Sequence, residues 1–133
     1  MTQEMTAVDL VKSMYDAFLR GDLETIFAHL TPDCQWVAPG EGIPNAGSYV
    51  GPQGAAEFFQ KMNATEQITR FEPREYFVNG DDVIALGYEE CTSKLTGKQA
   101  KTNFTMLFRM TEGKVRHFEV FYDTAAYLQA HQS

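Results

Sequence analysis

Residues 104–123, reading FTMLFRMTEGKVRHFEVFYD, most constrain what the chain can fold into. Two strand-like runs, 104–110 and 114–122, flank the residues TEG at 111–113. A three-residue connection ending in glycine suits a hairpin, because glycine readily takes the positive φ that such a loop needs. Alternation places the bulky apolar side chains of both runs on one face: Phe104, Met106, Phe108, Phe118, Val120 and Tyr122. The sequence therefore predicts the middle of a curved sheet that wraps a core or a cavity.

Composition predicts one globular domain over residues 1–133. Apolar residues make up 44% of the chain, which is long enough to bury a sizeable core. The net charge of −7 disfavours nucleic acid and acidic membrane surfaces as partners. We expect a cytoplasmic protein, because the sequence has no run of about 18 apolar residues and no signal-peptide pattern at its start. Cys34 and Cys91 lack metal-type spacing and are expected to be buried free thiols, with a disulfide or a reactive thiol as the alternatives.

Helical periodicity dominates the first half of the chain. Residues 5–19 repeat apolar side chains every three or four positions, with Thr6 as a candidate N-cap and Gly21 as a stop signal. Asp22 is expected to cap a second helix that continues through Leu30 and ends at residues 31–33. Pro52 opens a third helix that ends near residue 63.

Strands are predicted from residue 34 onward, apart from the third helix. Residues 34–37 form a short strand, and 38–51 form a long Gly- and Pro-rich loop of the kind that often serves as a lid or rim. Residues 68–78 form a strand in which Pro73 indicates an edge or a bulge. An Asn-Gly-Asp-Asp turn at 79–82 then leads into strands 83–93 and 101–110, and residues 124–130 form a terminal helical turn. Helices followed by a strand meander predict an α+β fold.

The order of four segments resembles the nuclear transport factor 2-like superfamily. These are AFLRGDLETI, CQWVAPGEGIPNAGSYVGPQGAAEFF, the TGK turn and EGKVRHFEVFYDTA. Within that superfamily the chain resembles SnoaL-like polyketide cyclases and ketosteroid isomerase-related proteins. The resemblance implies a cystatin-like, cone-shaped α+β barrel, with three N-terminal helices packed in a strongly curved, mainly antiparallel sheet. It also implies a pocket between the loop after the first strand and the end of the chain, and a homodimer packed through the outer sheet faces.

The catalytic positions of ketosteroid isomerases carry unsuitable residues in this sequence. The resemblance places the carboxylate base at Ala38, the first-helix tyrosine at Met14 and the protonated aspartate at Met106. Tyr15 is no simple substitute for Met14, because neighbouring helix residues point about 100° apart. Ketosteroid isomerisation is therefore not expected.

Comparison with SnoaL-like cyclases points to Asp123 as an acid and base. Those enzymes carry a pocket aspartate near the end of the last long strand, where this chain reads FYDTA. Desolvation at the mouth of an apolar pocket would raise the pKa of Asp123 and let it exchange protons near neutral pH. The alternative is that Asp123 caps the terminal helical turn through the amides of Ala125 or Ala126. The two roles are compatible.

One of Glu89 and Glu90 must point inward, because strand neighbours face opposite ways. That glutamate is either half of a structural ion pair or a second pocket acid. His117 is expected on the outer face, and no residues have convincing metal-ligand spacing. The residues expected to line the pocket are Met14, Tyr15, Phe18, Trp36, Tyr49, Phe58, Glu89, Phe104, Met106, Phe118, Val120 and Tyr122.

Three functions fit these observations. The first is a cofactor-free cyclase, isomerase, dehydratase or hydrolase that acts on a small, apolar, oxygenated substrate through Asp123. The second is a non-catalytic module that binds a hydrophobic ligand, which the apolar residues Met14, Ala38 and Met106 favour. The third is a dimerisation domain with a filled interior.

Overall fold

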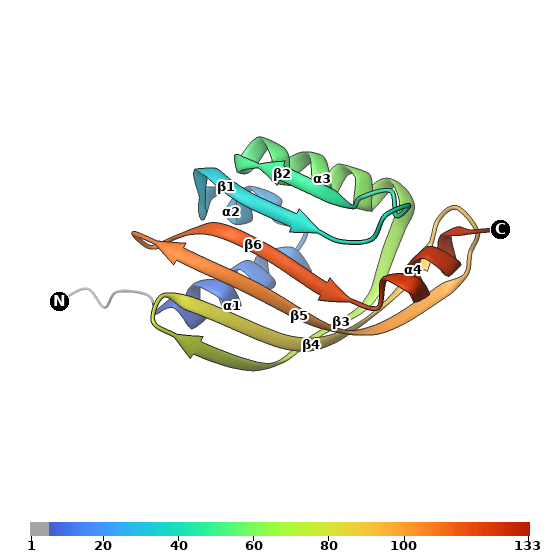
Figure 1. Ribbon diagram of the computed structural model, residues 1–133. Helices are drawn as coiled ribbons and strands as arrows, with labels where there is room; N and C mark the ends of the chain where they lie inside the picture. The colour runs from blue at the N-terminus through green and yellow to red at the C-terminus, as the bar shows by residue number, and fades with distance from the viewer. Residues whose placement is uncertain (1–5) are drawn as a thin grey trace.

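The computed structural model describes residues 6–133 (Figure 1). In this range the helices are α1 (Ala7–Leu19), α2 (Leu23–Ala28), α3 (Gly51–Thr65) and α4 (Thr124–His131). The strands are β1 (Leu30–Ala38), β2 (Gly47–Val50), β3 (Glu66–Asn79), β4 (Asp82–Ser93), β5 (Gln99–Thr111) and β6 (Lys114–Tyr122). They form one sheet in the order β2-β1-β6-β5-β4-β3, and the predicted α+β architecture is confirmed.

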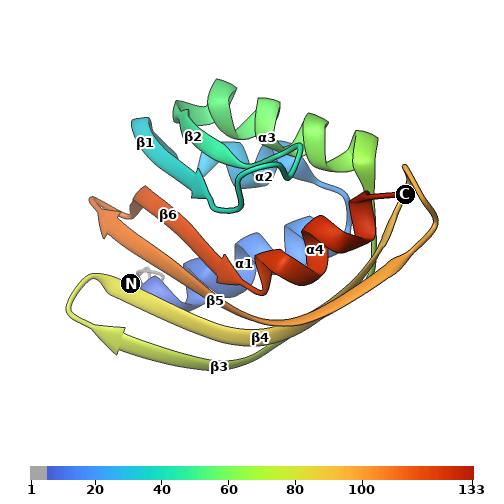
Figure 2. The same cartoon turned by 45° about the vertical axis from the view of Figure 1, so that its right-hand side comes forward.

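The sheet is strongly curved and surrounds α1 on its concave side, while α3 and the β1–β2 pair lie across from the long strands (Figure 2). Neighbouring strands run antiparallel except β1 and β6, which pair in parallel. The predicted cone is therefore confirmed, but the term barrel is wrong. The sheet stays open between its edge strands β2 and β3.

Local sequence explains where α1 begins and ends. The Thr6 side chain accepts a hydrogen bond from the Asp9 amide at 3.1 Å, and the Asp9 side chain accepts one from the Thr6 amide, so the predicted cap is a full capping box. Gly21 follows the helix at a φ of +73°, a conformation that favours glycine. Met5, the first residue of the predicted helix, lies outside the described residues.

Two predictions for the segment between the first and third helices were wrong: the end of the second helix and the extent of the irregular loop. The second helix ends at Ala28, and Leu30 already begins β1, where it pairs with Val115 of β6. Part of the predicted irregular loop is the short strand β2, which pairs with the end of β1. The partner of Leu30 is far away in the sequence, and β2 pairs across the loop with the end of β1, so neither strand follows from local periodicity alone.

The hairpin of β5 and β6 forms as predicted, but its connection is two residues long. Thr111 pairs with Lys114, so Glu112 and Gly113 form the loop at φ values of +49° and +77°. Two successive positive φ values match the tight turns whose twist suits a hairpin. At the other end of the sheet Pro73 lies on the edge strand β3 next to a register shift, so both of its predicted roles are confirmed.

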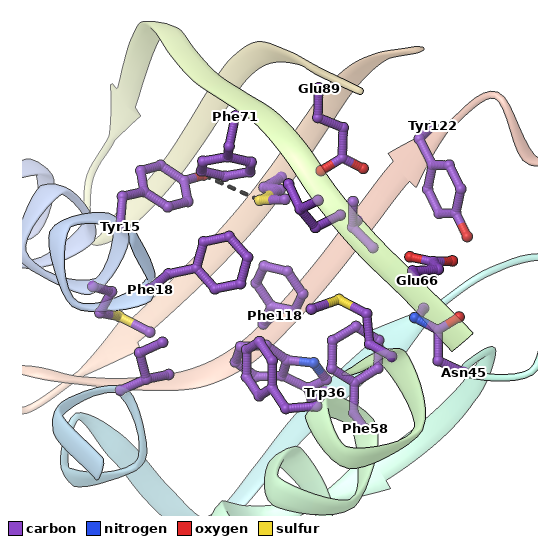
Figure 3. A pocket seen from close by; sticks show the side chains of 18 of the residues that line it. Tyr15, Phe18, Trp36, Asn45, Phe58, Glu66, Phe71, Glu89, Phe118 and Tyr122 are labelled. Atoms are coloured by element: carbon purple, nitrogen blue, oxygen red, sulfur yellow. Dashed lines mark hydrogen bonds between the residues drawn. The ribbon is translucent and has the colours of Figure 1, made fainter. Parts of the chain in front are cut away.

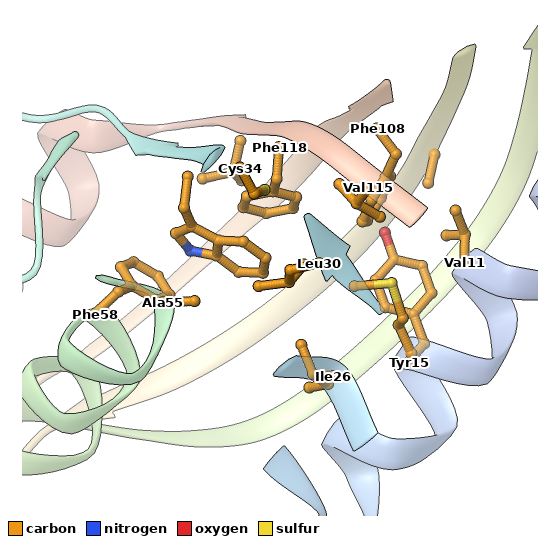
Figure 4. Close-up of a cluster of buried hydrophobic side chains, with 14 of the residues drawn as sticks. Val11, Tyr15, Ile26, Leu30, Cys34, Ala55, Phe58, Phe108, Val115 and Phe118 are labelled. Carbon is orange, nitrogen blue, oxygen red and sulfur yellow. The ribbon is translucent and has the colours of Figure 1, made fainter. Parts of the chain in front are cut away.

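The core lies between the concave face of the sheet and helices α1, α2 and α3 (Figure 4). Trp36 stacks on Phe118 with ring centroids 4.0 Å apart, which joins β1 to β6 across their parallel pairing. Phe108, Val11 and Val115 are almost completely inaccessible to solvent. Cys34 and Cys91 are free and buried, as predicted, and burial raises the pKa of the Cys34 thiol to about 11.

Gly87 permits the close approach of two strands and an aromatic ring in the bend of β4. A Cβ atom at this position would lie 2.5 Å from the carbonyl oxygen of Glu72 and 2.3 Å from the Phe104 ring. We therefore expect Gly87→Ala to lower the free energy of unfolding by about 1–3 kcal/mol, the usual range for overpacking. Urea denaturation measures this effect. Gly80→Ala is the comparison, since a Cβ there meets no atom within 4 Å. Only the positive φ of this residue disfavours alanine. Equal stability of wild type and Gly87→Ala would contradict the prediction.

The convex face of the sheet carries apolar side chains in contact with solvent. Phe121 is 48% exposed and Ile84 is 39% exposed, with the partly buried Leu107 paired to Ile84. This pattern agrees with the expected homodimer, which remains a prediction. No helix within residues 6–133 is long and apolar enough to cross a membrane.

Candidate functional site

The concave face of the sheet and the helices enclose a cavity of about 90 Å³ (Figure 3). Half of the residues in its wall are aromatic. Tyr15 and Phe18 come from α1, Phe58 from α3, Phe71 from β3 and Phe118 from β6. The interior is therefore not completely filled by side chains, which disfavours the third sequence-based hypothesis, a dimerisation domain without a cavity.

One side of the cavity is polar. Asn45, Glu66, Glu89 and Tyr122 all direct polar atoms toward it (Figure 3), and Tyr127 of α4 completes this part of the lining. These residues come from the loop before β2, the start of β3, β4, the end of β6 and α4. The cavity thus combines an apolar body with a polar end, the usual composition of a site for a small organic molecule.

Glu89 is one of two acids at this polar end. It continues the inward-facing positions of β4 beyond Val83, Ala85 and Gly87, and part of its surface stays accessible because it faces the cavity. The Tyr127 hydroxyl donates a hydrogen bond to Glu89 Oε1 at 2.7 Å, while Oε2 has no partner within residues 6–133. Desolvation raises the pKa of Glu89 to about 7, with the Tyr127 hydrogen bond opposing and the nearby charge of Glu66 adding to the shift.

Glu90 points the opposite way. Its carboxylate lies 3.3 Å from Arg70 and 3.8 Å from Lys101 on the outer side of the sheet. The two alternatives left by the sequence are therefore resolved, and the inward glutamate is Glu89.

Glu66 belongs to a buried chain of three polar side chains. His131 of α4 lies with Nε2 3.1 Å from Glu66 Oε1 and Nδ1 2.7 Å from Ser93 Oγ. The side chains of Glu66 and His131 are only 3% and 4% exposed. Desolvation raises the pKa of Glu66, and the contact with His131 opposes that rise. Through Tyr127 and His131, α4 therefore holds both of the carboxyl groups that line the cavity.

The loop between β1 and β2 places Asn45 at the cavity and keeps it rigid. The Tyr49 hydroxyl donates a hydrogen bond to the Asn45 carbonyl at 3.0 Å, and Ile43 and Ala46 amides close turns within the loop. Tyr49 also packs edge-on against Phe58. Tyr49 was predicted to line the pocket, but it lies behind the wall and positions the loop.

Ten of the twelve predicted pocket residues line the cavity: Met14, Tyr15, Phe18, Trp36, Phe58, Glu89, Met106, Phe118, Val120 and Tyr122. Tyr49 and Phe104 are the exceptions. Phe104 has the predicted inward orientation but stacks against Phe71 at 5.1 Å, and Phe71 covers it from the cavity. Their shared function as a ligand pocket remains a proposal.

Asp123 is not among the residues that line the cavity. It is the N-cap of α4, where its Oδ1 accepts a hydrogen bond from the Ala126 amide at 3.1 Å. The Asp123 amide donates to the Thr102 hydroxyl, which fixes the chain as β6 ends. The capping alternative for Asp123 is therefore present in the structure.

The three positions matched to ketosteroid isomerase catalytic groups all lie in the lining of the cavity: Met14, Ala38 and Met106. The Tyr15 hydroxyl donates to the Met106 sulfur at 3.1 Å, so it is engaged inside the wall. These three positions are therefore apolar in this chain, and the two carboxyl groups of the lining come from other positions, Glu66 and Glu89.

Several lining residues were missed by the sequence analysis: Ile26, Ala38, Asn45, Phe59, Met62, Glu66, Ile68, Phe71, Phe108 and Tyr127. Phe108 had been assigned to the apolar face but not to the pocket. Ile68 and Phe71 are three residues apart yet both face inward, because a register shift between Ile68 and Arg70 resets the alternation. Glu66 lies at the junction of α3 and β3, where neither the helical nor the strand periodicity predicts the direction of a side chain.

Within residues 6–133, no group of three or more His, Cys, Asp or Glu side chains is placed to hold a metal ion.

Residues 11–118 match the SnoaL-like domain family. The chain is a SnoaL-like protein. The match covers most of the chain and includes α3, the strands β1 to β5 and β6 as far as Phe118. Membership confirms the resemblance that the four sequence segments indicated.

Solved structures share the whole fold. An NTF2-like protein from Burkholderia thailandensis E264 is 29% identical, with a TM-score of 0.90 over 98% of this chain and 100% of that one. TerC, co-crystallised with polyporic acid, is 28% identical, with a TM-score of 0.85 over 96% and 98%. A putative polyketide cyclase from Xanthomonas campestris pv. campestris is 22% identical, with a TM-score of 0.77 over 95% and 96%, and shows the fold alone. The sequence has no match among curated proteins.

Proposed function

We propose that this SnoaL-like protein binds a small, largely apolar, oxygenated molecule in its cavity and catalyses proton transfer on it without a cofactor. The reaction class is that of a cyclase, isomerase or dehydratase. The observation that carries the proposal is the placement of the Glu89 carboxyl, which faces an aromatic cavity with one oxygen free. Its pKa of about 7 leaves both protonation states populated at neutral pH.

Glu89 fits the role of a general base and acid. Tyr127 holds Oε1, so Oε2 is the atom that takes a proton from a carbon next to a substrate carbonyl and returns it elsewhere. Such proton transfer contributes about 10²- to 10⁴-fold to a rate. The acidic group that the sequence analysis assigned to Asp123 is thus reassigned to Glu89, because the Asp123 carboxyl caps α4 and Glu89 lines the cavity.

The relatives support a ligand in this cavity. TerC was crystallised with polyporic acid, and TerC and this chain share their fold over nearly the full length of both. Polyporic acid is therefore a reasonable first ligand to test by thermal shift. Binding would show as a higher midpoint of unfolding that increases with ligand concentration.

The alternative function is binding without catalysis. It is favoured by the three apolar residues Met14, Ala38 and Met106 where related isomerases carry catalytic groups. In that case the cavity would hold a hydrophobic ligand, and Glu89 would serve only to satisfy the Tyr127 hydroxyl.

Exchange of α-hydrogens tests the proposal without knowledge of the natural substrate. Acetophenone, a one-ring ketone, is incubated with the protein in D₂O, and loss of its methyl proton signal is followed by NMR. We expect the protein-catalysed rate to rise with pH through about 7 and then level off, because Glu89 acts as a base only after it loses its proton. Binding of acetophenone without accelerated exchange would favour the alternative function.

A further inference from the structure

We propose that the Tyr122 hydroxyl is a second catalytic group, which donates a hydrogen bond to a carbonyl oxygen of the substrate while Glu89 removes a proton from the neighbouring carbon. This inference rests on the proposed proton transfer and adds the group that stabilises the charge formed on oxygen. It also narrows the substrate class to molecules with a C–H bond next to a carbonyl group. Tyr122 and Glu89 both direct their oxygen atoms into the polar end of the cavity (Figure 3).

Tyr122 carries the free hydroxyl of the cavity lining. Three tyrosines supply the hydroxyl groups that line the cavity: Tyr15, Tyr122 and Tyr127. Tyr15 donates to the Met106 sulfur and Tyr127 donates to Glu89 Oε1, so both are engaged. The Tyr122 hydroxyl has no hydrogen-bond partner within residues 6–133 and is therefore the one available to a ligand.

The Tyr122 hydroxyl is also open to a ligand atom. In the described part of the chain, the unpaired polar side-chain atoms that lack accessible surface are Thr31 Oγ1, Trp36 Nε1 and Asn45 Oδ1, and the Tyr122 hydroxyl is not one of them. The residue as a whole is partly exposed. A donor that is open and unpaired can exchange a water molecule for a substrate oxygen without breaking a hydrogen bond within the protein.

Tyr127 orients both the donor and the base. Its ring packs edge-on against Tyr122 with ring centroids 4.7 Å apart, and its hydroxyl holds Glu89 Oε1 at 2.7 Å. Tyr122 is the last residue of β6 and pairs with Phe104 of β5, which fixes its backbone. The two groups are therefore positioned before a ligand arrives, and this preorganisation is what makes a hydrogen-bond donor effective in catalysis.

The sheet sets the distance between donor and base. Strand β5 lies between β4 and β6, so the backbones of Glu89 and Tyr122 are two strand spacings apart, about 10 Å across the sheet. Their partners on β5 are Thr102 and Phe104, which are two residues apart. Both side chains extend from the concave face toward the cavity between them. A ketone can therefore lie in this gap, with its oxygen toward Tyr122 and its α-carbon toward Glu89.

The proposed step moves one proton and two electron pairs. Glu89 Oε2 takes the proton, the C–H electron pair forms a carbon–carbon double bond, and the carbonyl π electrons move to oxygen. Tyr122 keeps its own proton and stabilises the enolate through a hydrogen bond, because burial and the charges of Glu66 and Glu89 raise the pKa of its hydroxyl. Return of a proton from Glu89 to carbon reverses the step. In D₂O the returned atom is deuterium once the Glu89 carboxyl has exchanged with solvent.

Tyr122→Phe tests the donor, because it removes only this hydroxyl group. Acetophenone labelled with carbon-13 at the carbonyl is titrated into each protein at pH 8, where Glu89 has largely lost its proton and cannot donate. A hydrogen bond moves a carbonyl carbon signal to higher chemical shift, so the bound signal should lie at higher shift in wild type than in Tyr122→Phe. The α-hydrogen exchange should slow by about a hundredfold or more, the usual loss for one donor to a developing oxyanion. Acetophenone affinity should fall by about tenfold or less, as for one ordinary hydrogen bond.

Tyr88→Phe is the matched control. The guanidinium groups of Arg70 and Arg74 lie over the Tyr88 ring, and Tyr88 is not part of the cavity lining. This change therefore removes a hydroxyl group without altering the cavity, and its exchange rate and bound carbonyl signal should equal those of wild type. Toluene, which has no oxygen, should bind wild type and Tyr122→Phe equally, and this titration confirms that the cavity of the variant is intact.

The outcomes separate the donor from the function beneath it. If wild type catalyses exchange and Tyr122→Phe exchanges at the same rate or keeps the same bound carbonyl signal, the donor role is wrong and catalysis by Glu89 stands. A carbonyl signal that changes in Asn45→Ala instead would make Asn45 the donor and would also overturn the inference. If wild type binds no acetophenone, or binds it without accelerated exchange, the proposed function fails and the catalytic role of Tyr122 fails with it.

Discussion

Glu89→Gln is expected to slow α-hydrogen exchange by about a hundredfold or more. The change removes the ionisable oxygen that faces the cavity, and its shape still allows the Tyr127 hydroxyl to donate to the remaining carbonyl. Proton transfer by a positioned side chain contributes about 10²- to 10⁴-fold, and this contribution is lost. Toluene affinity should remain close to wild type, because the aromatic wall is unaltered. The NMR exchange assay and a toluene titration measure the two effects.

The same variant should be more stable than wild type at alkaline pH. The folded state raises the pKa of Glu89 from 4.5 to about 7, so the folded protein holds this proton more tightly than the unfolded chain. The free energy of unfolding of wild type therefore falls as pH rises from about 4.5 to 7, by about 3 kcal/mol, and stays low above that range. Glutamine does not titrate, so Glu89→Gln should lack this fall. Urea denaturation at pH 5 and pH 8 measures the difference.

Asp123→Asn is the matched control for both measurements. Asparagine caps helices as well as aspartate does, so this variant removes the carboxyl group and keeps the cap on α4. Exchange should continue at the wild-type rate. If Asp123→Asn abolished exchange and Glu89→Gln did not, the acid would be Asp123 after all, as the sequence alone indicated.

His131→Ala is expected to cost about 3–5 kcal/mol of stability at pH 8. The change leaves Glu66 as a buried carboxylate without a partner, and breaking a buried pair from one side has a cost of this size. The loss should be smaller at pH 5, because Glu66 without its partner can take up a proton and become neutral. Chemical denaturation of both proteins at the two pH values gives this difference.

His117→Ala provides the comparison for His131. His117 also lies 3.1 Å from a glutamate, Glu119, but the two side chains are 25% and 31% exposed on the outer face. Pairs of this kind contribute about 0–1 kcal/mol. A similar loss of stability in both variants would show that the buried contact between His131 and Glu66 adds no special stability. A loss in His131→Ala that does not change with pH would show that the charge of Glu66 is not its cause.

The alternation of Phe104, Met106 and Phe108 was enough to predict the inward face of the sheet, because side chains on a strand must alternate. The Asn-Gly turn and Pro73 placed the hairpin and the edge strand for similarly local reasons. Strand β2 and the early start of β1 were not predictable in this way. The start of β1 pairs with Val115 of β6, which is far away in the sequence, and β2 can pair only once β1 has its place in the sheet.

The sequence predicted the part of the site that follows from local side-chain patterns. The aromatic wall follows from alternation and helical spacing, so most of its members were identified. Asp123 and Glu89 were both candidates, and which of them faces the cavity depends on how α4 turns back after β6. Glu66 and Asn45 lie at a helix–strand junction and in a loop, where no period predicts the direction of a side chain.

The helix α4 lies outside the sheet, yet Tyr127 and His131 on its surface each contact one cavity acid. Residues four apart lie on the same side of a helix, so one short segment supports both contacts. If Glu89 transfers protons as proposed, burial causes most of the rise in its pKa, and the Tyr127 hydrogen bond from α4 lowers that pKa again. Two SnoaL-like proteins that differ only in the final-helix residues that contact these carboxyl groups should carry out the proposed proton transfer at different acidities.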